Sequence, residues 1–166
     1  MNETEPETFQ VRLVEKPARR LILRRGHEAT DYWGYCEECG CDVWGELQSL
    51  RGALDEPMGM WLPERFRKPE TSEYVMAVEM PADYQGTVPD GMEILDLPPC
   101  HYLLFQGPPY SDEGMGEAIG KVWKAIESYQ PEPAGWQWAD ESAPRFQYAP
   151  MPERGYIEGR PVKPVG

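Results

Sequence analysis

The sequence predicts an α+β protein with a mostly antiparallel sheet and two main helices, arranged as a tandem β-α-β-β pseudo-repeat. Two stretches have apolar residues at every third or fourth position, which is typical of helices packed on a core. Short segments of alternating apolar residues flank them, as in half-buried strands. Because this order occurs twice, we interpret the 166 residues as one domain with pseudo-repeats at about 9–84 and 85–166 and a frayed tail at 1–8.

The first pseudo-repeat begins with the segment FQVRLVEKPARRLILRRG, residues 9–26. Its apolar residues alternate at first and then cluster at 21–23, and Pro17 predicts a bend between these two parts. A single helix is expected over 35–54, because the apolar residues there are three or four positions apart. They are Cys36, Cys39, Val43, Leu47, Leu50 and Leu54. The segment SEYVMAVEM, residues 72–80, is the next strand.

Three cysteines lie close together at positions 36, 39 and 41. A structural zinc site needs four tetrahedral ligands, which usually come from two pairs. The remaining soft ligands form no second pair; they are Cys100, His27 and His101. Cys36 and Cys39 are in line with the apolar residues of the expected helix, and Cys41 is expected to point away from them. We therefore interpret the cluster as small apolar helix residues. A redox role is the alternative, because a helix N-terminus can acidify a thiol.

The second pseudo-repeat has the same order. The segment MEILDLPPCHYLLFQG (92–107) is a broken strand like the first, and a helix is expected over 113–129, with Ser111 or Asp112 as its N-cap. Two short strands follow, in PRFQYAPM (144–151) and GYIEGRPV (155–162). A Val-Trp pair occurs in both helices, at 43–44 and 122–123. Trp44 and Trp123 lie beside apolar helix residues, so both are expected to be structural.

The composition argues against some partners. A formal net charge of −13 repels phosphate, which argues against nucleic acids and anionic membranes. An acidic surface favours cationic partners, or it serves solubility alone. No apolar stretch approaches the roughly 20 residues that cross a bilayer, and the N-terminal MNETEPETFQ has no apolar signal core. A cytoplasmic location with reduced thiols is therefore expected.

Three features of the second half carry a family resemblance. A Met-Glu-Ile strand follows Val-Pro-Asp-Gly at 88–94, a Gly-Pro-Pro-Tyr turn at 107–110 precedes a helix, and a glutamate in the last strand is followed by Pro-Val at 161–162. Residues 70–165, and more faintly the first half, resemble the GyrI-like small-molecule-binding domain, which also forms the effector-binding domain of multidrug-sensing regulators. The resemblance implies two halves around a central, aromatic ligand cleft that contains a carboxylate and accepts bulky, often cationic aromatic compounds.

The same resemblance assigns residues to this cleft. Tyr110 matches the tyrosine of the turn, and Glu158 matches the glutamate of the last strand. Only two residues separate Glu158 from the Pro-Val pair, where the family usually has three, and Arg160 is placed to neutralise the carboxylate. The full set expected to bind ligand is Glu158, Tyr110, Trp136, Trp138 and Tyr156. Aromatic faces attract flat cations, which suits such a ligand.

Three functions are compatible with the sequence. The first is a stand-alone, monomeric multidrug-binding protein that sequesters hydrophobic aromatic compounds, preferably cations, and uses no metal or cofactor. The sequence contains no helix-turn-helix segment, which argues against a DNA-binding regulator. The second is a hydrolase of cyclopropane-containing DNA-alkylating natural products, in which Glu158 or Tyr110 activates water or polarises the substrate. Some GyrI-like proteins act by a third route, as inhibitors that contact DNA gyrase.

We predict that the purified protein holds no zinc at the cysteine cluster. The reason is that only one group of closely spaced thiols is present and the helix pattern assigns Cys36 and Cys39 to an apolar face. Elemental analysis checks this prediction. One equivalent of zinc per chain, retained after dialysis, would contradict it.

Overall fold

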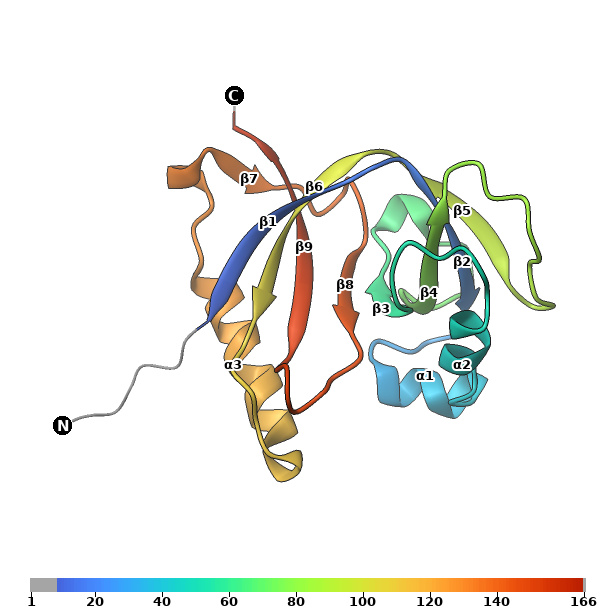
Figure 1. Ribbon diagram of the computed structural model, residues 1–166, viewed down its shortest axis with the longest axis horizontal. Coiled ribbons are helices and arrows are strands. Elements are labelled where there is room, and N and C mark those ends of the chain that lie inside the picture. Colours follow the sequence, from blue (N-terminus) through green and yellow to red (C-terminus); the bar gives the residue numbers. More distant parts are fainter. Residues whose placement is uncertain (1–8, 166) are drawn as a thin grey trace.

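The computed structural model describes residues 9–165, so the frayed tail expected at 1–8 lies outside the described residues (Figure 1). Within this range the chain forms nine strands, three α-helices and three short 3-10 helices. The first half contains β1 (Gln10–Lys16), β2 (Arg19–Arg25), α1 (Tyr32–Cys39), α2 (Val43–Gln48), β3 (Met58–Trp61) and β4 (Tyr74–Pro81). The second contains β5 (Glu93–Leu97), β6 (Cys100–Gln106), α3 (Met115–Ser128), β7 (Trp136–Trp138), β8 (Arg145–Tyr148) and β9 (Ile157–Pro164).

The strands form one antiparallel sheet in the order β1-β6-β9-β8-β3-β4-β2-β5, with β7 added to β9. The sheet order is symmetric about its centre: counted inward from the two edges, each strand of one half meets its counterpart in the other half. β1 corresponds to β5, β6 to β2, β9 to β4, and β8 to β3. The β3–β8 pair joins the halves at the centre. The expected pseudo-repeat and the mostly antiparallel sheet are therefore confirmed.

The first strand of each half pairs with the other half. β1 pairs with β6, whereas β5 pairs with β2. The breaks that allow this crossing lie at the prolines: β1 ends just before Pro17, and β5 ends just before Pro98 and Pro99. A proline lacks the N–H needed for a continuous ladder, so each broken strand becomes two separate strands.

The helix expected over 35–54 is wrong in its extent, because two shorter helices replace it. α1 begins at Tyr32, where Asp31 caps it by accepting a hydrogen bond from the backbone N–H of Gly34 at 2.9 Å. Gly40 ends α1 with a φ of 84°, a conformation that a residue with a side chain rarely adopts. α2 ends at Gln48, and Leu54 lies beyond it with 48% of its surface exposed. The other expected helix, over 113–129, is confirmed, because α3 lies within that range.

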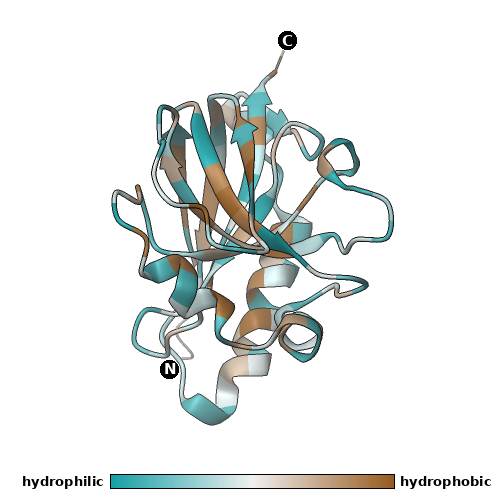
Figure 2. Ribbon diagram, turned by 90° about the vertical axis from the view of Figure 1, so that its right-hand side faces the viewer, coloured by the Kyte–Doolittle hydropathy of each residue, from teal (hydrophilic) through white to brown (hydrophobic). Residues whose placement is uncertain are grey.

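All three helices cover the same face of the sheet (Figures 1 and 2). Under α1 and α2, residues Tyr35, Val43 and Leu47 pack on every second residue of β4; these are Tyr74, Met76, Val78 and Met80. Under α3, Val122 and Ile126 pack on Leu103 and Phe105 of β6. The opposite face of the sheet is buried in a third cluster that draws on both halves. It includes Leu21, Leu23, Met58, Met60, Tyr102, Leu104 and Phe146.

A buried carboxylate fixes the crossing of β1. Glu79 of β4 is 2% exposed and accepts hydrogen bonds from Lys16 and from Arg19, each at 2.7 Å. Arg19, 1% exposed, also donates to the carbonyl oxygen of Pro98 and to the hydroxyl of Tyr102. One charged network therefore ties the end of β1 and the start of β2 to β4 and β6.

Replacing Glu79 with glutamine should lower the free energy of unfolding by about 3 kcal/mol, because buried Arg19 and partly buried Lys16 would lose their counter-charge. Urea denaturation followed by circular dichroism measures the change. Asp96→Asn is the control, since it breaks the exposed pair between Asp96 and Arg20 and should cost less than about 1 kcal/mol. Equal losses for the two variants would contradict a stabilising role for the buried network.

Candidate functional site

A cleft opens on the helix-covered face, along the line where the two halves meet. Its floor follows one row of residues across the sheet, in which Met76 pairs with Gly59, Gly59 with Gln147, and Gln147 with Glu158. Residues directly opposite one another on neighbouring strands point to the same face, so this row lies between α1 and α2 on one side and α3 on the other. The fold therefore places the cleft at the pseudo-two-fold axis.

The cleft has a volume of about 530 Å³ and is mainly apolar. Seven aromatic residues contribute to its walls. They come from six different elements and are Tyr32, Trp33, Trp44, Trp61, Tyr74, Trp123 and Tyr148. Three methionines, at positions 76, 115 and 151, fill the spaces between them. Methionine side chains adapt their shape readily, so this wall suits ligands of varied outline.

The aromatic rings of the floor are held by hydrogen bonds. Trp61 donates from Nε1 to the carbonyl oxygen of Thr30 at 2.8 Å, and Tyr74 donates to Oε1 of Gln147 at 2.9 Å. Tyr148 also borders the cleft, but its ring packs on Phe146 on the opposite face of the sheet, and its hydroxyl donates to the Asp55 carboxylate. Burial raises the pKa of Tyr74, which therefore stays a neutral donor.

Three tryptophans stand at the rim of the cleft. Trp33 is 63% exposed, and Trp123 is 44% exposed although its Nε1 donates a hydrogen bond to Glu158. Nε1 of Trp44 is buried without a hydrogen-bond partner among the described residues. Of the three, Trp33 therefore has the most room to adjust to a ligand.

Trp44 and Trp123, which the sequence suggested are structural, also line the cleft. In each Val-Trp pair the valine takes the core position, since Val43 is 2% and Val122 is 1% exposed. The next residue is turned by about 100° around the helix. Both tryptophans therefore reach the cleft from opposite sides. The repeated Val-Trp pair in the sequence was the signal that could have assigned them.

Glu158 lies below the cleft surface rather than in it. The side chain is completely buried and accepts hydrogen bonds from three groups: Nε1 of Trp123 at 2.9 Å, the hydroxyl of Tyr156 at 2.7 Å, and Nε of Arg160 at 2.7 Å. Arg160 therefore neutralises this carboxylate, as the sequence suggested.

A chain of hydrogen bonds leads from Glu158 along the floor. Tyr156 donates to Glu158 and accepts from Nε2 of Gln147 at 3.1 Å, and Gln147 in turn accepts from Tyr74. Burial and the adjacent Glu158 raise the pKa of Tyr156, so its hydroxyl remains protonated. The polar groups beneath the cleft therefore form hydrogen bonds with one another, and the charge of Glu158 is paired with Arg160.

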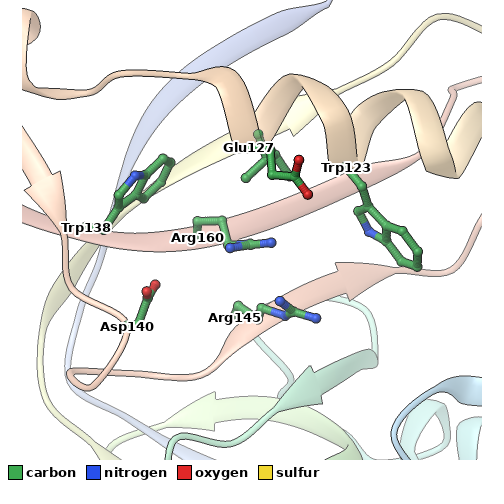
Figure 3. A pocket seen from close by; sticks show the side chains of 7 residues that line it. Trp123, Glu127, Trp138, Asp140, Arg145 and Arg160 are labelled. Carbon is green, nitrogen blue, oxygen red and sulfur yellow. The ribbon is translucent and has the colours of Figure 1, made fainter.

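The other residues expected to bind ligand are dispersed. Trp138 lines a second cavity, of about 420 Å³, that shares Trp123 with the cleft (Figure 3). Trp136 instead packs against His101, with ring centroids 4.9 Å apart and the ring planes tilted by 45°. Tyr110 lines neither cavity; its hydroxyl is buried without a partner among the described residues, and burial raises its pKa.

The cysteine cluster borders the cleft. Cys41 lies on its wall, and the break at Gly40 brings Cys41 back to Cys36, which corrects the expectation that the two point apart. Burial and the contact with Cys41 raise the pKa of Cys36, the opposite of an activated thiol. Among residues 9–165 no group of three or more His, Cys, Asp and Glu side chains is arranged to hold a metal ion.

Comparisons with known proteins support the fold. No protein-family model matches the sequence, and no curated protein matches it. Among solved structures, SAV2435 bound to tetraphenylphosphonium is similar over 93% of this chain and 94% of its own, with a TM-score of 0.57 and 15% identity. The C-terminal domain of EcmrR is similar over 95% and 99%, with a TM-score of 0.57 and 11% identity. A protein from Staphylococcus aureus MU50 is similar over 93% and 98%, with a TM-score of 0.56 and 16% identity.

These likenesses confirm the resemblance to the GyrI-like fold that the sequence indicated. They cover nearly the whole described chain, including both pseudo-repeats. No helix in the described part of the chain is long and apolar enough to cross a membrane.

Arg160→Met should lower the free energy of unfolding by about 3 kcal/mol, because it leaves the buried Glu158 without its counter-charge. Thermal or urea unfolding measures the loss, and Arg160→Lys should restore part of it by returning a cation. The control is Glu117→Gln, which removes the exposed pair with Lys121 and should cost less than about 0.5 kcal/mol. An Arg160→Met variant as stable as the wild type would show that Glu158 does not depend on this partner.

Proposed function

We propose that the protein binds bulky hydrophobic small molecules in the cleft between its two pseudo-repeats, with a preference for cationic aromatic compounds. The observation that carries this proposal is the set of seven aromatic residues that line a cavity of about 530 Å³. Ligand sites commonly have volumes of roughly 300–1,000 Å³, with apolar walls and a few polar groups. This cleft has that size and composition.

Proteins of the same fold support a small-molecule ligand. SAV2435 was solved with tetraphenylphosphonium, a lipophilic cation with four phenyl rings. The fold alone does not transfer a ligand from one protein to another. The aromatic cleft of this chain is the independent feature that makes a ligand of this kind suitable.

Three features favour a cation over an anion. The faces of the aromatic rings carry partial negative charge, and each contributes about 1 kcal/mol when a cation stacks on it. Asp31 adds a carboxylate to the wall, although it also accepts the hydrogen bond that caps α1. The formal net charge of −13 raises the local concentration of cations around the whole molecule.

Glu158 is expected to act on a bound ligand without contacting it. Its carboxylate lies behind Trp123 and is already paired with Arg160, so a ligand in the cleft meets the indole ring before it meets the charge. The rings should therefore govern affinity, and Glu158 should influence charge preference at longer range.

Binding fits the geometry better than hydrolysis of a cyclopropane-containing compound. A carboxylate that activates water must reach that water by a hydrogen bond. Glu158 is completely buried and engaged by three donors, and Tyr110 lies outside the cleft lining. Incubation with such an alkylating compound distinguishes the two functions, because ring-opened product formed at a catalytic rate would favour the hydrolase.

We predict micromolar binding of tetraphenylphosphonium, about −8 kcal/mol, and much weaker binding of tetraphenylborate, an anion of the same shape. Isothermal titration calorimetry measures both affinities. Trp44→Ala should weaken binding of the cation by about tenfold, because it removes one stacking face and part of the buried apolar wall.

The matched control is Trp136→Ala, which removes an indole that lines neither cavity and should leave the affinity unchanged. Glu158→Gln should reduce the preference for the cation more than it reduces affinity. Equal affinities for the two ions, or a Trp44→Ala variant that binds as the wild type does, would contradict the proposed site.

A further inference from the structure

The second cavity has a chemistry different from that of the cleft. Its lining consists of Trp123, Ile126, Glu127, Trp138, Asp140, Arg145 and Arg160. Two tryptophans form its apolar part, and two guanidinium groups extend side by side from β8 and β9 (Figure 3). At about 420 Å³ it has room for a flat ligand of one or two rings.

The two arginines lie next to each other because of the strand register. β8 and β9 pair through Phe146–Gly159 and Gln147–Glu158, and Arg145 and Arg160 occupy the next position of the same ladder. Cationic side chains at facing positions repel each other, so this arrangement costs stability unless an anion lies nearby. Glu158 supplies one negative charge for two positive charges.

That one carboxylate is committed to Arg160, whose Nε donates to it at 2.7 Å. Arg145 forms no ion pair within the described part of the chain, and its Nε is buried without a hydrogen-bond partner. Its guanidinium carbon instead lies 4.2 Å from the centre of the Trp61 ring. Burial lowers the pKa of Arg145, as does the adjacent Arg160, and the nearby charge of Glu158 offsets only part of this effect. Arg145 is thus a half-buried cation that forms no ion pair of its own, with Glu158 acting on it only from a distance.

The two acidic residues of the lining do not fill this role. Glu127 and Asp140 are exposed, and neither forms a hydrogen bond or ion pair with Arg145. They stand at the rim, where they disfavour ligands with several negative charges, as does the net charge of −13. A single negative charge on a planar group is what the guanidinium accepts best, because its parallel N–H groups match a carboxylate.

We propose that this second cavity binds a small planar aromatic carboxylate, with its carboxylate on Arg145 and its ring against Trp138. Trp138 is fixed for such a contact, since it packs on Phe105 and Tyr129 at centroid distances of 6.2 and 6.3 Å. The proposal does not rest on the cation-binding function of the cleft. The protein would then hold two adjacent sites of opposite charge preference, separated by Trp123.

The test uses 2-naphthoate and its neutral counterpart 2-naphthamide, titrated by calorimetry into the 166-residue protein. Naphthoate should bind at least about tenfold more tightly than the amide, and 0.5 M NaCl should reduce that difference. Arg145→Met should abolish the difference, and Arg145→Lys should retain part of it, because lysine returns the charge without the planar fork. Equal affinities of the two probes for the wild type would overturn the proposal.

Two controls keep the result specific. Arg12→Met removes an exposed arginine of β1 and should bind naphthoate as the wild type does. Trp44→Ala alters the cleft and should also leave naphthoate binding unchanged, whereas Trp138→Ala should weaken it by about fivefold. If Arg145→Met does not fold, the Arg145→Lys and Trp138→Ala variants decide the matter. Loss of naphthoate binding in Trp44→Ala but not in Trp138→Ala would place the anion in the cleft and overturn the assignment.

Discussion

The exchange of the first strands between the halves is the constraint on which the structure depends. β1 completes the sheet of the second half by pairing with β6, and β5 completes that of the first by pairing with β2. Neither half therefore forms its sheet alone, and the two are held as one body with β3 and β8 side by side at the centre. The cleft follows directly, because the helices of both halves cover the same face and leave the central pair open between them.

Each face of this sheet contains one buried glutamate, and the two glutamates differ in how many cations surround them. On the closed face, Glu79 is surrounded by two cations and locks the crossing strand. On the helix-covered face, Glu158 is paired with Arg160, so that the half-buried Arg145 beside it has no ion pair of its own. Uncompensated buried charge costs folding stability, and it is commonly found where a protein binds something.

The sequence predicted the repeated order of elements because hydrophobic period and proline positions are local signals. It also anticipated the Glu158–Arg160 pair, since alternate residues of a strand share a face. It did not predict the break of the first helix, because the spacing of apolar residues carries no information about the positive φ that Gly40 adopts. It also did not predict the walls of the cleft, which come from six elements that only the folded sheet brings together. Trp136 and Trp138 share a face of β7, as their alternation predicts, but only Trp138 lines a cavity, which the alternation alone does not show.

The symmetric strand order also bears on how such a chain arose. A protein of half this length, with the order of β1 to β4, would leave one edge of its sheet unpaired and its first strand without a partner. Two copies would satisfy each other by swapping those strands across a two-fold axis, and their helices would enclose a symmetric cleft. Once the two copies were joined in one chain, the residues on the two sides of that cleft could mutate independently and so become different. Met76 and Glu158 occupy equivalent places on either side of the Gly59–Gln147 pair, and an apolar side chain facing a carboxylate there is what such divergence would produce.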